Sequence, residues 1–90
     1  MRLGNTSTDE QDINFLSKNG NWQVGSNVKG NGKNGNQFYI YNTDDSKYCL
    51  TVQRESGNVG IGTNTPSSKL HVNGSTLISS TLSVTEAVTL

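Results

Sequence analysis

The sequence predicts an all-β fold without a long helix. Apolar side chains in residues 1–62 recur at every second position, which gives a strand one apolar face, and no window shows a helical period of 3.6 residues. Clusters of Gly, Asn, Ser and Thr separate these alternating runs, as turns separate strands. The C-terminal residues instead repeat in units of six. We therefore expect a β-rich module over residues 1–62 and a slender β-shaft over residues 63–90.

The first expected unit is a β-hairpin over residues 12–25. Its first strand places Ile13 and Phe15 on one face, and the returning strand, at residues 22–24, also has both of its apolar residues on one face. Between them lies Asn19-Gly20, a dipeptide typical of two-residue hairpin turns in which both central residues adopt positive φ. The turn is therefore expected at this pair.

Two further strands are expected at residues 37–42 and 48–53. The first turns Tyr39 and Tyr41 to one face and its Phe and Ile side chains to the other. By the same alternation, the second is expected to place three side chains on one face: Tyr48, Leu50 and Val52.

A short strand at residues 59–61 is expected to precede the stretch "TPSSK". Thr65 is suited to cap a helix and Pro66 to occupy its first position, so one helical turn at most is expected there. A strand over Leu70–Val72 is expected to follow.

The segment that begins at Leu70 divides into the hexads LHVNGS, TLISST, LSVTEA and the partial VTL. Seven of the eight residues at the first and third positions are apolar, and Thr76 is the exception. Residues at i and i+2 share a strand face, so each hexad offers one short strand and one corner. Hexad periods are typical of β-solenoid and fibre-like proteins. A heptad coiled coil fits poorly, because Ser and Thr are poor helix formers.

The chain carries few apolar residues for its length, since Leu, Ile, Val and Phe make up 20 of its 90 residues. Ordering one residue costs roughly 1.5 kcal/mol of conformational entropy, whereas burying one apolar side chain stabilises the fold by about 1.5–3 kcal/mol. A lone compact monomer would therefore have too few apolar side chains to offset the cost of folding. The single cysteine cannot form an internal disulfide. Association with other chains is the expected remedy.

The formal net charge is zero, which gives no electrostatic reason to expect nucleic acid or an anionic membrane as a partner. No apolar run approaches the length of a membrane span. We therefore expect neither nucleic-acid binding nor membrane insertion.

The stretch GNVGIGTNTPSSKLHVNG, residues 57–74, resembles the G-x-VGIGTTxPxxKLxVxG segment of phage and giant-virus tail-fibre or head-fibre proteins, which are related to trimeric adhesive fibres. The residues that follow, STLISSTLSVTEAVTL, resemble the Ser/Thr-rich shaft repeats of the same proteins. Residues 35–53 resemble a strand pair often found upstream. The matching positions of the main segment are Val59, Gly60, Ile61, Gly62, Thr63, Pro66, Lys69, Leu70, Val72 and Gly74.

The resemblance implies an elongated homotrimer of intertwined β-strands with a triple-stranded shaft. Gly60 and Gly62 lack Cβ atoms, which would let three backbones approach a common axis. Pro66 would redirect each chain into the shaft. Many members end in a self-cleaving chaperone domain with a Ser/Lys pair, which these 90 residues do not contain, so self-cleavage is not expected. The expected trimer core and shaft residues are Gly60, Ile61, Gly62, Pro66, Leu70, Val72, Ile78, Leu82, Val84 and Val88.

Reactive side chains do not form a catalytic pattern. "GNGKNG" at residues 30–35 matches G-x-G-x-x-G, but no βαβ unit surrounds it, so a loop is expected. His71 alternates outward; a metal-binding ring of three such residues on a threefold axis is the less favoured alternative. Asp44-Asp45 suits a turn better than a Ca²⁺ site, and Cys49 suits a half-buried strand position. We therefore expect no enzymatic activity, no cofactor and no metal.

Trp22, Tyr39 and Tyr41 are the candidates for contact with a glycan or receptor, because aromatic rings stack on sugars and anchor interfaces. The alternative is that Trp22 belongs to a core and that the tyrosines fill a face between chains. Together with the resemblance, the sequence predicts a structural component of a viral tail or head fibre on the virion surface, which supports host attachment. Its expected partners are its own copies, neighbouring fibre segments or virion proteins, with a host-surface glycan as a further candidate. The alternative function is a carbohydrate-binding head that uses the exposed aromatic residues.

Overall fold

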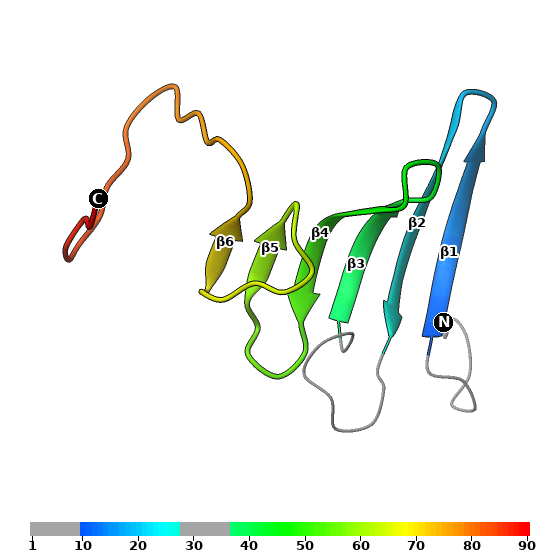
Figure 1. Ribbon diagram of the computed structural model, residues 1–90, viewed down its shortest axis with the longest axis horizontal. Coiled ribbons are helices and arrows are strands. Elements are labelled where there is room, and N and C mark those ends of the chain that lie inside the picture. Colours follow the sequence, from blue (N-terminus) through cyan, green and yellow to red (C-terminus); the bar gives the residue numbers. More distant parts are fainter. Residues whose placement is uncertain (1–9, 28–36) are drawn as a thin grey trace.

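A computed structural model of the chain describes residues 10–27 and 37–90, which form one open six-stranded sheet (Figure 1). Each strand pairs with its sequence neighbours, in the order β1-β2-β3-β4-β5-β6. All pairs are antiparallel except β5 with β6, which is parallel. No helix occurs in the described residues, and the all-β prediction is confirmed. The strands are β1 (Glu10–Ser17), β2 (Gly20–Asn27), β3 (Gln37–Asn42), β4 (Lys47–Gln53), β5 (Val59–Ile61) and β6 (Leu70–Val72).

The N-terminal hairpin forms as predicted, but its turn differs. Ser17 pairs with Gly20, so the turn consists of Lys18 and Asn19, and Gly20 already belongs to β2. None of these residues has positive φ, so the expected turn geometry was wrong. A side chain helps to close the hairpin end instead: Asn21 Oδ1 accepts a hydrogen bond from the Ser17 backbone N at 3.1 Å.

A β-bulge in β4 sets the face of Tyr48. Ile40 pairs with Leu50 and the next residue, Tyr41, pairs with Tyr48, which leaves Cys49 as the extra residue. An extra residue shifts the alternation by one, so Tyr48 turns to the face of Tyr41 and away from Leu50. The prediction that Tyr48 shares a face with Leu50 and Val52 was therefore wrong.

The connection between β5 and β6, residues 62–69, folds back over the sheet without a helical turn. Gly62 turns the chain away from β5 with a φ of +75°. The buried hydroxyl of Thr51 then donates to the Thr63 carbonyl at 2.8 Å. Pro66 is buried within this connection. The Thr63 carbonyl thus bonds the connection to the sheet. Thr65 and Pro66 do not start a helix.

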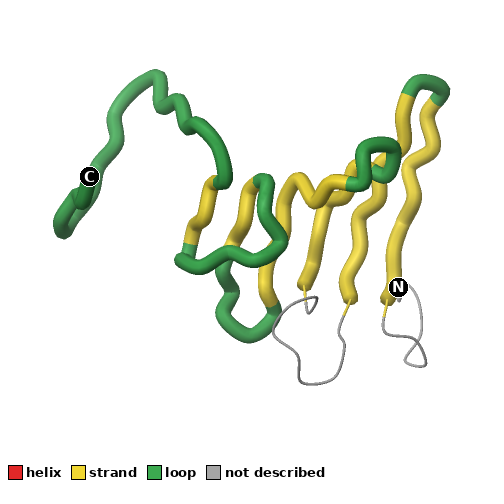
Figure 2. Tube along the Cα trace, in the orientation of Figure 1, coloured by secondary structure: helices red, strands yellow, loops and turns green. Residues whose placement is uncertain are grey.

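Residues 73–90 leave the sheet after β6 and form neither strand nor helix (Figures 1 and 2). The sheet therefore extends beyond residue 62 to Val72, through the first half of the first hexad. The Cα radius of gyration is 15.6 Å, compared with about 12 Å for a compact chain of this length. How the later hexads pair in an assembly stays a prediction.

The buried side chains lie on the polar face of the sheet. Tyr39, at 1% exposure, is the one buried hydrophobic residue among the described residues, and Gln37 and Thr51 are buried polar residues. Gln37 and Tyr39 alternate along β3, and Tyr39 pairs with Thr51 of β4, so all three share one face. The chain's own residues thus cover the polar face of the sheet and leave its apolar face uncovered.

Candidate functional site

The uncovered face of the sheet carries two apolar rows. The strand register aligns side chains across neighbouring strands, and alternation turns them to the same side. We call the residues of these rows the apolar face. One row crosses all six strands through Ile13, Val24, Ile40, Leu50, Ile61 and Val72. The second crosses four strands through Phe38, Val52, Val59 and Leu70, and Phe15 pairs with Trp22 at one end of the β1–β2 hairpin.

The described chain leaves this face open to solvent. Phe38, at the middle of the sheet, is 49% exposed, and large side chains on the outer strands are exposed to a similar degree. The whole chain exposes 7101 Å², whereas a compact monomer of 9.7 kDa exposes about 5100 Å². The open face and the exposed residues 73–90 both contribute to the excess of roughly 2000 Å².

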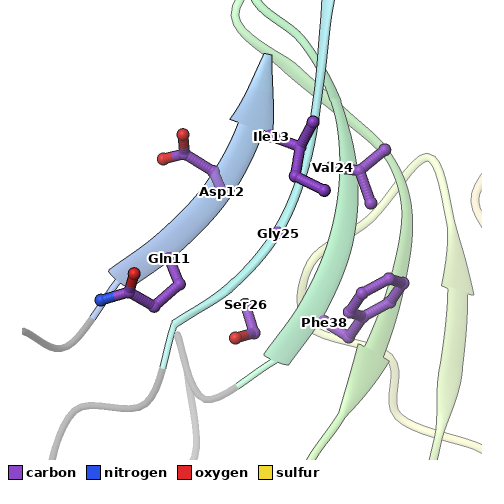
Figure 3. Close-up of a pocket in the computed structure, with 7 residues that line it drawn as sticks. All are labelled: Gln11, Asp12, Ile13, Val24, Gly25, Ser26 and Phe38. Carbon is purple, nitrogen blue, oxygen red and sulfur yellow. The ribbon is translucent and has the colours of Figure 1, made fainter. Parts of the chain in front are cut away.

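A shallow hollow of about 190 Å³ interrupts the apolar face near its β1 side. Figure 3 shows Ile13, Val24 and Phe38 projecting from three neighbouring strands around it. The floor dips because the small Ser26 lies between the longer Gln11 and Phe38 in its row. A cavity of about 150 Å³ holds a benzene molecule, so the hollow has room for one large apolar side chain.

The opposite face holds a cluster of three tyrosines. The rings of Tyr39 and Tyr48 meet edge to face at 5.5 Å between centroids, and those of Tyr41 and Tyr48 lie tilted at 4.7 Å. Gln23 Nε2 donates to the Tyr39 hydroxyl at 3.3 Å. The bulge at Cys49 brings Tyr48 into this cluster, which the sequence pattern did not indicate.

Gly60 lies under the β5–β6 connection on the same polar face. A Cβ atom at this position would stand 2.5 Å from the Thr63 carbonyl oxygen and 2.9 Å from Thr51 Oγ1. The missing side chain therefore makes room for the chain's own loop. This is a different role from the expected approach of three backbones to a common axis.

The three aromatic candidates for glycan contact lie on different faces. Trp22 belongs to the apolar face, whereas Tyr39 and Tyr41 lie on the polar face. Tyr39 is buried, and Tyr41 is half-buried beside it. The structure therefore brings two of the candidates together and separates the third.

The expected core and shaft residues separate into three groups. Ile61, Leu70 and Val72 join the apolar face, as their alternation predicts. Gly60, Gly62 and Pro66 shape the β5–β6 connection. The shaft residues beyond β6 are exposed on the extended C-terminal segment: Ile78, Leu82, Val84 and Val88.

The ionisable and polar candidates serve local structure. His71 Nδ1 accepts a hydrogen bond from the Ser67 backbone N at 3.2 Å. Asp44 Oδ2 accepts one from the Asn21 backbone N at 2.9 Å, which ties the β3–β4 turn to β2. Cys49 is a free, half-buried thiol.

No metal-binding cluster occurs in the described residues. Within residues 10–27 and 37–90, no group of three His, Cys, Asp or Glu side chains is placed to hold a metal ion. The same ranges contain no helix long and apolar enough to cross a membrane. The glycine-rich stretch at residues 30–35 lies outside the described residues.

The chain matches no protein-family model and no curated protein.

Proposed function

We propose that the chain is a self-assembling structural segment of a viral fibre or appendage, built as a homotrimer on the virion surface and supporting attachment to the host. The observation that carries this proposal is the open apolar face, which crosses six strands without a covering layer in the described chain. An apolar surface of this size marks an interaction site. Copies of the same chain are the occupants proposed, with neighbouring fibre segments or virion proteins at the ends.

The exposed C-terminal segment supports the same proposal. Its apolar side chains stand in solvent, and its backbone forms no strand ladder within the chain. If three parallel copies come together, their backbone N–H and C=O groups become buried and need hydrogen-bond partners. Neighbouring chains supply these partners when the hexads form the shaft. The resemblance of residues 57–90 to fibre segments points to the same architecture. The proposal includes no catalytic step.

Assembly is tested by the mass of the particle in solution. Light scattering after gel filtration is expected to give three times the chain mass of 9.7 kDa. Thermal unfolding is also expected to shift with protein concentration, because folding and association are coupled. A stable monomer at micromolar concentration would contradict the proposal, and immunogold labelling of particles would test the virion location.

The register of the shaft is tested by two deletions. Removing residues 76–81 joins Ser75 to Leu82 and keeps the hexad in phase. Removing residues 79–81 shifts the alternation by an odd number, which moves the later apolar residues to the opposite face. The shorter deletion is therefore expected to lower the melting temperature of the assembly more than the longer one. Equal melting, or the reverse order, would show that the repeat has no structural role.

A further inference from the structure

Three segments far apart in the sequence meet at one end of the sheet around a polar hollow. They are the end of the β3–β4 turn, the start of the β5–β6 connection and the exit from β6, which lie together because β5 runs antiparallel to β4 and parallel to β6. The hollow measures about 540 Å³, which is within the usual size of a small-ligand site. Its lining residues are Ser46, Lys47, Tyr48, Gly62, Thr63, Asn64 and Asn73.

The walls of this hollow are held by backbone hydrogen bonds. The Gly62 N donates to the Cys49 carbonyl at 3.1 Å, and the Asn73 N donates to the Ile61 carbonyl at 2.9 Å. The Asn73 side chain also donates to the Gly62 carbonyl at 3.3 Å. These bonds cross from β4 to β5 and from β5 to β6, so the hollow is formed before any ligand enters.

The lining is rich in hydrogen-bonding groups and carries one positive charge. It combines one tyrosine ring with two amide side chains, two hydroxyl side chains and one ammonium group, and it contains no carboxylate. Among the described residues, the Asn64 amide and the Tyr48 hydroxyl have no hydrogen-bond partner, so they are open to a ligand. The Tyr41 ring lies tilted against the Tyr48 ring, with 4.7 Å between the ring centroids. An aromatic ring beside amide and hydroxyl groups suits a hydroxyl-rich ligand, since one side of a sugar is apolar and its rim is polar.

We propose that this hollow binds one sugar unit, with the Tyr48 ring against the sugar and the Asn64 amide bonded to its hydroxyls. The site depends on the bulge at Cys49, which turns Tyr48 toward it. Tyr48 lies on the face opposite the apolar face, so copies that cover the apolar face leave the sugar site open. The inference goes beyond the structural role proposed above and holds for either a monomer or a trimer.

Amide chemical-shift titration of the ¹⁵N-labelled protein tests the site. The probes are the methyl glycosides of glucose, galactose, N-acetylglucosamine and N-acetylneuraminic acid, each raised to millimolar concentration. At least one is expected to shift the backbone amides of Tyr48, Asn64 and Asn73. The glycoside that shifts these amides at the lowest concentration identifies the kind of sugar that the hollow prefers. If none of the four shifts these amides, the proposal is overturned.

Two substitutions separate binding from folding. Asn64→Ala removes an amide that bonds to no described residue, so the fold is expected to remain while the dissociation constant rises about fivefold. Tyr48→Phe keeps the ring and removes the hydroxyl, with a smaller rise expected, and it provides the test if Asn64→Ala does not fold. Asn14→Ala, an exposed amide on β1, is the matched control and is expected to bind normally. Unchanged affinity in both site variants would overturn the assignment, and light scattering on the same samples reports assembly separately.

Discussion

Phe38→Asp is expected to convert the assembly into monomers. Phe38 lies near the middle of the apolar face, beside the hollow in Figure 3, and it is half exposed in the single chain. An isolated chain therefore keeps a new carboxylate in water. In the proposed trimer the same carboxylate would be buried without a partner, which costs several kcal/mol per chain. A loss of about 3 kcal/mol weakens association roughly a hundredfold. Light scattering across a dilution series measures the change.

Leu16→Asp is the matched control for this experiment. Leu16 is also apolar and even more exposed, at 78%, but it alternates onto the opposite face of β1. Its replacement is expected to leave the assembly mass unchanged. If Leu16→Asp dissociates the assembly and Phe38→Asp does not, the contact surface is the polar face and the proposed interface is wrong.

Gly60→Ala is expected to cost about 2–4 kcal/mol of folding free energy. The new methyl group would meet the Thr63 carbonyl and the Thr51 hydroxyl at distances shorter than van der Waals contact. Neither atom is the end of a long side chain that swings away, so the β5–β6 connection has to lift from the sheet. The buried hydrogen bond between Thr51 and Thr63 is then strained or lost. Urea unfolding at fixed protein concentration measures the difference.

Gly20→Ala provides the control for a glycine substitution in this sheet. Its new Cβ would lie 3.2 Å from Asp44 Oδ2, an exposed side-chain atom that has to shift by only a few tenths of an ångström and can keep its hydrogen bond to the Asn21 N, and Gly20 has no positive φ. A change below about 1 kcal/mol is expected. Equal losses in the two variants would indicate that the connection does not rest on Gly60.

The strands were predictable from the sequence because alternation is a local property. Runs such as residues 37–42 carry their own period of two, and a strand needs little else to be recognised. The bulge at Cys49 was not predictable in the same way, because it is a property of the register between β3 and β4. One extra residue then placed Tyr48 in the tyrosine cluster and at the wall of the polar hollow.

The composition also indicated that a single chain lacks a sufficient apolar core. It did not indicate which face of the sheet the chain's own residues cover. Counting apolar residues indicates that a single chain buries too little. It does not indicate that residues 62–69 lie over the polar face, because that contact depends on Thr51 bonding to Thr63 from a distant strand. The sequence indicated that Gly60 and Gly62 have a structural role, whereas only the structure shows that Gly60 lies against Thr51 and Thr63.

The order of the strands has a consequence for how the chain is made. Because β1 to β6 neighbour one another in the order of the sequence, each strand has its partner available as soon as it leaves the ribosome. Sheets built from such near-neighbour pairs have low contact order and form quickly. Under the proposed assembly, the newly made sheet displays its apolar rows until other copies arrive. The encounter of chains would then limit the rate of maturation, and synthesis of several copies close together on one messenger RNA would favour correct assembly over aggregation.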